Sequence, residues 1–393
     1  MVRKGYAMAI TGELRKFVVP EIIYGCDAHQ LAGRYAQRFG LHTLLVVSDP
    51  GVEATGWAGQ VIESITAAGI AAVPFSAVTS NPKDHEVMAG AARYHDGGCN
   101  GIVAVGGGSP MDCAKGIGIV CSNGGHILDY VGVDQVPLPM PPLICIPTTA
   151  GTAADISQFA IITDTAGQRK TAIISKSLVP DIALIDPMLT VTMSPELTAC
   201  TGVDALIHAI EAYVSNASSP FTDLHALHAV RLVFANLQRA ISEPASIAAR
   251  DAMMFASTQA GMAFSNASLG AVHAMAHSLG GVLDSPHGEC NAMLLEHVIA
   301  FNFSAAPDRY RDIASAMDIN TTSMNDPEAC AALVAGIAGF MRAVGITGSL
   351  HQLGVTRTDL PQLADKALLD ACMATNPRRP TRQEIEEIYA AAL

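Results

Sequence analysis

Two pairs of polar residues stand out in otherwise apolar stretches of the second half of the sequence. Asp204 lies four positions before His208, and His273 lies four positions before His277. On a helix, residues at this spacing share a face and lie one turn apart. A further histidine, His287, follows soon after. Burying such groups without partners would cost roughly 1–3 kcal/mol each, and a shared metal ion would remove that penalty.

One carboxylate and three imidazoles form a ligand set that suits Fe(II) or Zn(II), and the lack of a thiolate argues against a cysteine-type structural zinc site. Asp204, His208, His273 and His287 are therefore the predicted metal ligands, with room left for a substrate oxygen. His277 is then an extra histidine one turn from a ligand, and we expect it to relay a proton. A single histidine on an apolar helix is usually an ordinary core residue. The prediction therefore rests on the fact that polar residues recur at a spacing of four on otherwise apolar helices.

A glycine-rich turn occurs in the first half of the chain. Gly106-Gly107-Gly108-Ser109-Pro110 follows a strand predicted at 101–105 and precedes a helix that carries Asp112 and Lys115. Glycines permit positive φ and close approach of the backbone to a ligand, and the helix N-terminus offers unpaired N–H groups to a phosphate. A tight strand-to-helix connection would explain the same glycines, but the position after a predicted parallel strand favours ligand binding.

Asp49 ends another predicted strand, directly before Pro50. An acid at a strand end in a nucleotide-binding domain often accepts a hydrogen bond from a ribose hydroxyl, and it would repel an additional ribose phosphate. This interpretation favours NAD over NADP. An ordinary turn residue before a proline is an equally good explanation of Asp49.

The elements that would position these residues fall into two groups. In the first half, short apolar runs predict strands at 44–47, 71–75, 101–105 and 143–146. Helices are predicted between them, at about 53–68, from the end of the second strand to about 95, and from 110 onward. Continuous apolar strands separated by helices indicate a parallel sheet that is covered on both faces.

The second half has a different character. After Asp186-Pro187 we predict no strand, and helical patterns occur at about 204–214, 223–238, 248–264, 271–283 and 328–344. We therefore expect an α/β dinucleotide-binding domain with a Rossmann-like parallel sheet at residues 1–188, followed by an all-helical metal-binding and catalytic domain at 189–393. A ligand site is expected in the cleft between them.

Composition narrows the function classes further. Half of the 393 residues are hydrophobic, only 15% are charged, and the net charge is −13, which argues against disorder and against binding to nucleic acid. The nine cysteines are scattered without a C-x-x-C pair, so a reducing cytoplasm is expected rather than a disulfide framework. The first twenty residues lack a secretory signature, and no apolar run is long enough to predict a membrane span.

Taken together, these motifs resemble the iron-containing alcohol dehydrogenase family, over a match from about Phe17 to the C-terminus. The glycine turn with Asp112 and Lys115 looks like the family's GGGSxxDxxK turn. The other matching segments are 147–152, similar to PTTxGT, 202–213, similar to GxDALxHAxEAY, 270–288, similar to GxxHxxAHxxG…PHG, and 376–378, similar to a C-terminal NPR.

The resemblance implies roles for individual residues. It implies that the four ligands predicted above bind the metal and that the protein is a homodimer. It places Asp49 and Asn81 on the adenosine side of NAD(H) and Lys170 near the nicotinamide ribose. The residues expected to bind the cofactor are Asp49, Asn81, Gly107, Gly108, Ser109, Asp112, Thr148, Thr149, Thr152 and Lys170, and those expected to line the substrate pocket are Phe159, Phe264 and Cys372.

Two positions depart from the family pattern. Asp155 stands where the family commonly has Glu, which shortens the side chain in the threonine-rich loop by one methylene. Glu296 stands where Pro is usual, after Leu295. Neither position is a predicted metal ligand.

The expected function is metal-dependent, NAD(H)-linked interconversion of a small primary alcohol or diol and its aldehyde. Two alternatives stand beside it. Glycerol dehydrogenases and dehydroquinate synthases share the architecture but use zinc with a different ligand spacing, and the segment from His273 to His287 argues against them. A nucleotide-binding sensor without turnover would be favoured by a missing ligand, yet all four candidates are present.

Overall fold

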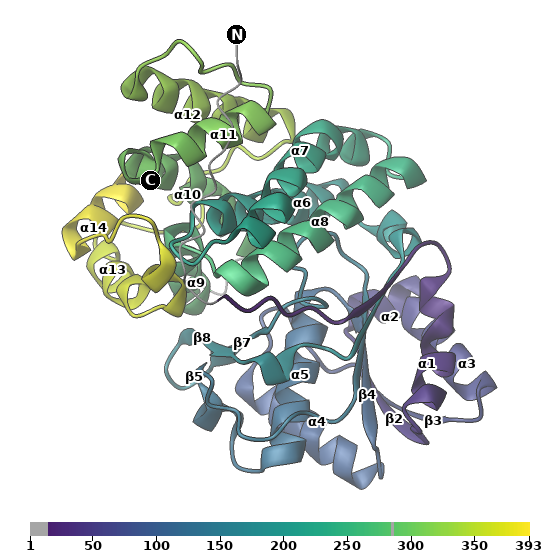
Figure 1. The fold of residues 1–393 in the computed structure, drawn as a ribbon. Helices are drawn as coiled ribbons and strands as arrows, with labels where there is room; N and C mark the ends of the chain where they lie inside the picture. The colour runs from purple at the N-terminus through teal and green to yellow at the C-terminus, as the bar shows by residue number, and fades with distance from the viewer. Residues whose placement is uncertain (1–14, 284–286) are drawn as a thin grey trace.

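The computed structural model describes residues 15–283 and 287–393, so the first fourteen residues and the motif residue Pro286 lie outside the described residues. A parallel sheet forms one half and a helical bundle the other (Figure 1). The sheet has the strand order β1-β9-β6-β4-β2-β3. Its strands are β1 (Glu21–Tyr24), β2 (Thr43–Val47), β3 (Ala71–Phe75), β4 (Gly101–Gly106), β6 (Leu143–Pro147) and β9 (Ile182–Ile185), and all neighbours are parallel.

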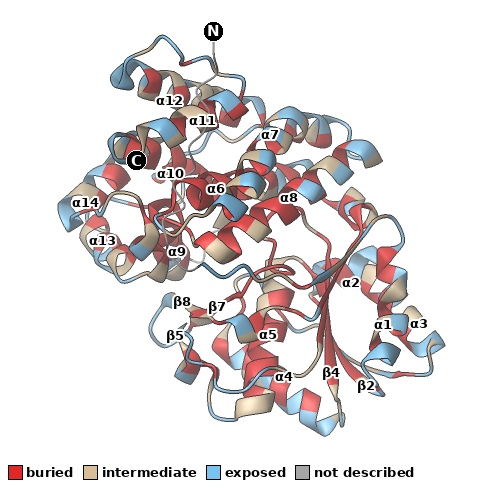
Figure 2. Ribbon diagram, in the orientation of Figure 1, coloured by how far each residue is buried: buried red, intermediate tan, exposed pale blue. Residues whose placement is uncertain are grey.

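Helices cover both faces of this sheet, as the continuous apolar strands predict. Leu44 and Val46 of β2 pack in the cluster that holds Val61, whereas the alternating Leu45 and Val47 pack in the cluster that holds Ile117. Figure 2 shows β4 buried along its length between these layers. The helices are α1 (Ala32–Arg38) and α3 (Trp57–Ala67) on one face, α4 (Asp84–Asp96) and α5 (Gly108–Asn123) on the other, with the short α2 (Pro50–Thr55) preceding α3.

The four predicted strands are confirmed, and the first predicted helix is present but is not continuous. The helix expected at 53–68 is broken into α2 and α3 because Gly56 adopts φ 84°, which ends one helix and starts the next. Strands β1 and β9 were not predicted. Nor was a second sheet of order β5-β8-β7, made of β5 (Gly132–Val133), β7 (Phe159–Asp164) and β8 (Arg169–Ile174).

The helical half is confirmed as well. After Ile185 the described part of the chain contains no further strand. The helices are α6 (Pro195–Val214), α7 (Pro220–Ser242), α8 (Ile247–Ala267), α9 (Ala271–Leu283), α10 (His287–Asn302), α11 (Pro307–Ala316), α12 (Asp326–Ala343), α13 (Leu360–Leu368) and α14 (Arg382–Ala391). Helix α6 begins before the predicted residue because the Ser194 hydroxyl caps it and Pro195 fits its first turn.

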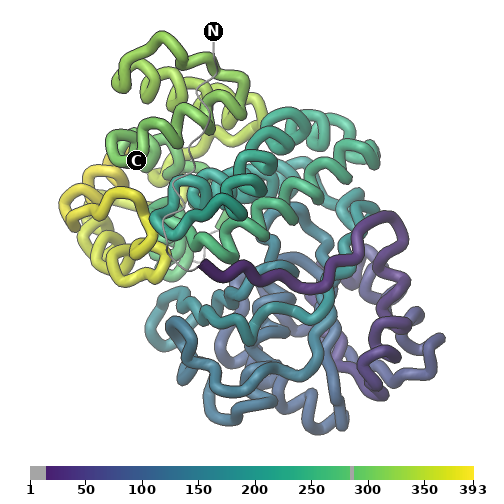
Figure 3. Tube along the Cα trace, in the orientation of Figure 1, coloured from purple at the N-terminus to yellow at the C-terminus, as the bar shows by residue number. Residues whose placement is uncertain are grey.

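The segment before β1 ties the two halves together. It runs along the helical bundle before entering the sheet (Figure 3). The Asn266 side chain in α8 accepts a hydrogen bond from the Val18 N–H at 2.7 Å and donates one to the Val18 carbonyl at 3.1 Å. The last residue of β1 adds a further link, since the Tyr24 hydroxyl donates to the Asp251 carboxylate in α8 at 2.8 Å.

Two expectations from composition can be compared with the structure. All nine cysteines lie among the described residues, and all are free. Within residues 15–283 and 287–393, no helix combines the length and the apolarity needed to cross a bilayer.

Lys115 connects α5 to the start of β7. Its side chain is fully buried, and its ammonium donates to the carbonyls of Ser157 at 2.8 Å and Phe159 at 2.7 Å. Burial lowers the pKa of Lys115, and the nearby Asp112 carboxylate opposes that shift. The lysine of the glycine-turn motif therefore fixes the backbone that carries Phe159.

Replacing Lys115 by methionine should destabilise the protein. Lys115→Met leaves two buried carbonyls without donors, at a cost of about 1–3 kcal/mol each. Urea unfolding should show a clear loss of stability relative to wild type. Lys176→Met, which removes an exposed lysine, is the matched control and should unfold like wild type. An unchanged unfolding midpoint for Lys115→Met would show that the buried ammonium contributes nothing to stability.

Candidate active site

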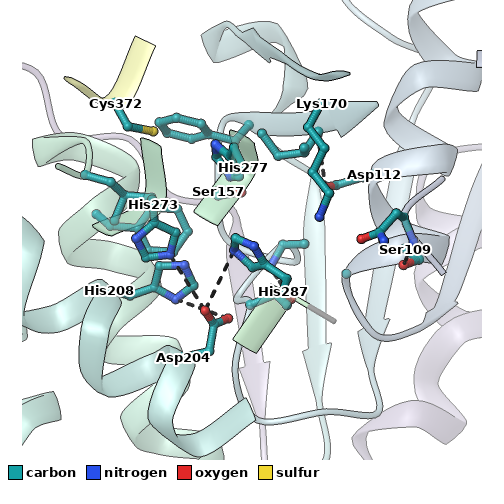
Figure 4. A pocket seen from close by; sticks show the side chains of 18 of the residues that line it. Ser109, Asp112, Ser157, Lys170, Asp204, His208, His273, His277, His287 and Cys372 are labelled. Carbon is teal, nitrogen blue, oxygen red and sulfur yellow. Dashed lines mark hydrogen bonds and ion pairs between the residues drawn. The ribbon is translucent and has the colours of Figure 1, made fainter. Parts of the chain in front are cut away.

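The four predicted metal ligands meet in the helical bundle (Figure 4). Asp204 and His208 come from α6, His273 from α9, and His287 begins α10. The Asp204 carboxylate lies 3.8 Å from Nδ1 of His208, 3.7 Å from Nε2 of His273 and 3.9 Å from Nε2 of His287. The structure therefore brings together side chains from three helices around one buried carboxylate.

This cluster fits a metal ion. Its nitrogen–oxygen separations are too long for hydrogen bonds, but two ligands each about 2.1 Å from one tetrahedral ion lie roughly 3.4 Å apart. The Nδ1 atom of His208 is buried and has no hydrogen-bond partner although it faces Asp204. A buried nitrogen without a partner is costly, and a metal ion would satisfy it. The donor set of one carboxylate and three imidazoles suits iron or zinc.

Burial and mutual charge set the ionisation of the ligands. Burial raises the pKa of Asp204, but the surrounding imidazoles, His208 first, outweigh it and hold that pKa well below its ordinary range. Burial lowers the pKa of His208 to about 4 and that of His287 well below its ordinary value. The cluster therefore favours an ionised carboxylate beside neutral imidazoles at these two positions, which is the protonation state that binds a metal.

Glu211 is a functional residue that the sequence analysis missed. Its carboxylate accepts a hydrogen bond from Nδ1 of His273 at 2.6 Å and another from the Val272 N–H at 2.7 Å. Against the effect of burial, the Asp204 and Glu211 carboxylates raise the pKa of His273 to about 9. Glu211 follows Asp204 and His208 at helical spacing on the same face of α6, and that spacing was the available signal.

The sequence analysis also missed Asn291, which likewise lies at helical spacing from a predicted ligand. It lies one turn after His287 on α10, and its amide nitrogen lies 2.8 Å from Asp204 Oδ1, 3.2 Å from His273 Nε2 and 3.1 Å from His287 Nε2. The amide thus contacts three of the four predicted ligands. It restrains the side chains that would otherwise repel or rotate away from one another.

A small cavity of about 120 Å³ opens beside the cluster. The predicted pocket residues Phe159, Phe264 and Cys372 all line it, and all three are buried. The Phe264 ring stacks on His208 with centroids 4.3 Å apart, so the apolar wall directly adjoins a predicted ligand. His277 lines the same cavity.

A larger cleft of about 640 Å³ lies at the carboxyl ends of β2, β4 and β6. The glycine turn and the loop that carries Thr148 and Thr149 both line it. The turn needs glycine at position 106, where φ is +155° and a Cβ atom would lie 2.6 Å from the Pro110 ring. The two cavities share lining residues at Ser109 and Asp204, so cleft and cluster are contiguous.

Asp49 lies at the edge of the large cleft and also caps α2. Its carboxylate accepts a hydrogen bond from the Val52 N–H at 2.9 Å. The capping role agrees with Asp49 as an ordinary turn residue before Pro50. Its position at the cleft is also compatible with an interaction with a ribose hydroxyl. Strand order reverses between β2 and β4, and such a switch point at the carboxyl edge is where doubly wound sheets bind nucleotides.

Three further predicted cofactor residues lie at or near the junction of the two cavities. Asn81 lines both cavities, and its N–H donates to the Ser109 hydroxyl at 3.2 Å. Lys170, on β8, lines the small cavity. Asp112 also lines it, and burial raises the pKa of this carboxyl to about 6, while it accepts a hydrogen bond from the Ile161 N–H at 3.1 Å.

The two departures from the family pattern have different surroundings. Asp155 is buried, and burial raises its pKa to about 6 against the opposing charge of Lys115. Glu296 is 37% exposed and lies 3.6 Å from His297, away from the predicted ligands. Asp155 therefore belongs to the packing around Lys115, whereas Glu296 is a surface residue.

Neutralising Glu211 should weaken metal binding. Glu211→Gln keeps the shape but removes the charge that orients His273, and losing such a partner typically lowers metal affinity about 10–100-fold. Competition with a chelator, followed by metal analysis, measures the change. Glu296→Gln on the exposed face of α10 is the control and should bind metal as wild type does. Equal affinities for both variants would contradict a role of Glu211 in the metal centre.

Comparisons with known proteins agree with this geometry. Residues 20–187 match the profile "Iron-containing alcohol dehydrogenase", and residues 198–393 match "Fe-containing alcohol dehydrogenase family, C-terminal". The 1,3-propanediol dehydrogenase of Klebsiella pneumoniae is 40% identical over 379 residues, covering 96% of this chain and 98% of its own. The NAD-dependent methanol dehydrogenase of Bacillus methanolicus is 36% identical, covering 96% and 99%.

Solved structures give the same result. A 1,3-propanediol oxidoreductase matches with a TM-score of 0.94 at 40% identity, over 97% of this chain and 100% of that one. An alcohol dehydrogenase from Oenococcus oeni also reaches a TM-score of 0.94, at 34% identity and the same coverage. The chain therefore belongs to the iron-containing alcohol dehydrogenase family and is a metal-dependent, NAD(H)-linked alcohol oxidoreductase.

Proposed function

We propose that this enzyme interconverts a small primary alcohol or diol and its aldehyde at the Asp204 cluster. The observation that carries the proposal is the junction of a nucleotide-sized cleft with a small apolar cavity at that cluster. The cavity has a volume of about 120 Å³, which suits a short chain rather than a sugar phosphate. Similar proteins named for 1,3-propanediol and methanol support the same substrate class.

Asp204, His208, His273 and His287 would hold the metal, with Fe(II) the expected ion. When bound, the metal supplies Lewis acidity toward a hydroxyl oxygen, and the nicotinamide accepts or returns the hydride. The protein contributes the fixed positions of these ligands. Glu211 and Asn291 hold the imidazoles, so that the cluster does not have to rearrange when substrate enters.

The glycine turn and the N-terminus of α5 would receive the cofactor's pyrophosphate, with Gly107, Gly108 and Ser109 at closest approach. Thr148, Thr149 and Thr152 would complete the cradle from the neighbouring loop. Asn81 would support the adenosine side, and Asp112 and Lys170 would border the nicotinamide end of the cleft, where they line the small cavity.

Phe159, Phe264 and Cys372 would enclose the alkyl part of the substrate. Their burial supports a dry wall beside the metal ligands, which would exclude water from the reacting carbon. His277 would hold or release the hydroxyl proton at Nε2, because its Nδ1 atom is already hydrogen-bonded. The proton would reach solvent from that ring.

Family membership weighs against both alternatives raised by the sequence. Four ligands, two supporting side chains and an adjoining cavity favour turnover over a nucleotide sensor. The spacing of His273 and His287 and the iron-containing relatives favour Fe(II) over a zinc-dependent glycerol dehydrogenase type of centre.

We also propose a domain boundary near residue 188, cytoplasmic action and a homo-oligomeric state. The last strand of the large sheet ends at Ile185, and the helical bundle follows, which supports the boundary. Free cysteines are typical of a reducing compartment. The exposed apolar side chains Phe221 and Leu224 on α7 support contact with another copy.

Anaerobic purification, metal analysis and an NADH assay test the proposed reaction. About one metal ion per chain is expected, with NADH formed from 1-propanol or 1,3-propanediol in the presence of Fe(II). His273→Ala should lose both metal and turnover, whereas His228→Ala, at an exposed position on α7, should retain them. A protein that binds NADH but oxidises no alcohol with Fe(II) or Zn(II) would refute the proposed substrate class.

Removing the charge at Asp49 should relax the choice of cofactor. Asp49→Asn keeps an oxygen to cap α2 but no longer repels a ribose phosphate, so kcat/KM with NADP should rise relative to NAD. The two ratios are measured by steady-state kinetics with one alcohol. Glu53→Gln, an exposed change in the same helix, is the control. If the NADP-to-NAD ratio is the same in both variants, Asp49 acts only as a cap.

A further inference from the structure

His277 is paired with an acid that the sequence analysis did not assign to the site. Its Nδ1 atom lies 2.8 Å from Oδ2 of Asp370, a residue 93 positions away in the chain. Both side chains are nearly buried, with 7% and 10% of their surfaces exposed. His277 lines the small cavity (Figure 4). Its contact with Asp370 therefore connects the cavity to the segment after α13.

The Asp370 carboxylate is held from both sides. Its other oxygen, Oδ1, accepts a hydrogen bond from the Cys372 N–H at 2.8 Å and thereby caps the short 3-10 helix Ala371–Thr375. Burial raises the pKa of Asp370, but the charge and the hydrogen bond of His277 outweigh it and keep that pKa below its ordinary value. The acid is therefore ionised at neutral pH.

An ionised carboxylate can only accept hydrogen bonds, so the hydrogen between the two residues must belong to Nδ1 of His277. In the neutral ring, Nε2 then carries a lone pair. The ring is also held in place by stacking on His287, with centroids 5.2 Å apart and planes at 16°. Asp370 thus determines which nitrogen can receive a proton.

We propose that Asp370 is the positioning residue that holds His277 in its Nδ1–H tautomer and thereby presents Nε2 as the proton acceptor for alcohol oxidation. This inference rests on the proposed role of His277. During oxidation the substrate O–H bond breaks and an Nε2–H bond forms, while the C–H electron pair leaves with the hydride for NAD⁺. The imidazolium keeps its Nδ1–H bond to Asp370 and releases the Nε2 proton to water. Aldehyde reduction uses the same steps in reverse.

Asparagine at position 370 separates this role from simple capping. Asp370→Asn retains an oxygen that can cap the Cys372 N–H. Its amide NH₂ then faces Nδ1 of His277, where two donors oppose each other. The ring can restore the hydrogen bond only by moving its hydrogen to Nε2, which removes the acceptor from the cavity.

The kinetic test compares Asp370→Asn, His277→Ala and the double variant in the metal-loaded enzyme. Loss of a positioned proton acceptor typically slows turnover about 10²–10⁴-fold, and we expect kcat of Asp370→Asn to fall in this range. Metal content, NADH affinity and unfolding midpoint should stay as in wild type. In the His277→Ala background the second change should have no further effect, because Asp370 acts through His277. Asp365→Asn, an exposed acid on α13 that pairs with Arg382, is the matched control and should be unaffected.

The outcomes separate the two proposals. If His277→Ala is slow but Asp370→Asn turns over as wild type does, Asp370 has no positioning role. Additive losses in the double variant would overturn the inference in the same way, because they would show an effect independent of His277. An undiminished kcat in His277→Ala would instead refute the proposed proton acceptor, and the role of Asp370 with it.

A second readout observes the tautomer directly. Long-range ¹H–¹⁵N spectra of the zinc-loaded, ¹⁵N-histidine-labelled enzyme distinguish the two ring nitrogens, with His277 assigned by its absence in His277→Ala. The expected result is an Nδ1–H ring in wild type and an Nε2–H ring in Asp370→Asn. An Nε2–H ring in wild type would overturn the inference whatever the kinetics show.

Discussion

The burial of one ionised carboxylate, Asp204, is the constraint around which the helical half is organised. A charge removed from water costs several kcal/mol unless partners surround it, and here three imidazoles and an amide do so. His208 lies on α6 beside Asp204, whereas the other two imidazoles and the amide come from α9 and α10, so both of these helices must pass close to the same part of α6. The apolar residues of all three helices pack behind the cluster and leave the polar side chains facing one another.

Each side chain of this centre is oriented by a further residue. Glu211 lies about one turn beyond His208 on the same face of α6 and accepts a hydrogen bond from His273. Asn291 contacts three of the four predicted ligands. Side chains held in this way lose little entropy when a ligand binds, so binding energy is available for the reaction. The chemistry of the site thus depends as much on the carboxylate and amide behind the imidazoles as on the imidazoles.

The sheet provides the second half of the site by a different principle. Parallel strands end together at one edge, and that edge exposes the N-terminus of α5 and the glycine turn to the cleft. Lys115 then fixes the start of β7, whose first residue, Phe159, forms a wall of the small cavity. The glycine-turn motif therefore acts at both cavities: its backbone borders the large one, and its lysine shapes the small one.

How much was visible in the sequence depends on the range of the interaction. Asp204 with His208, and His273 with His277, could be predicted as neighbours because a helix places residues four apart on one face. The buried strands and the glycine turn were equally local signals. Strand β8 was missed because it begins with three polar residues, and β7, which pairs with it, was missed although it begins with four apolar ones. The break at Gly56 was missed because a single positive φ interrupts an otherwise helical pattern.

What the sequence by itself determined was therefore the type of chemistry and the class of fold, since both depend on residue types at short spacing. Only the tertiary structure decided which residues support that chemistry. Asp370 reaches His277 across 93 positions, and Asn376 reaches the Ala271 N–H at the start of α9 across 105. No periodic pattern connects such pairs, because their contact depends on how α13 and the C-terminal segment pack against α9.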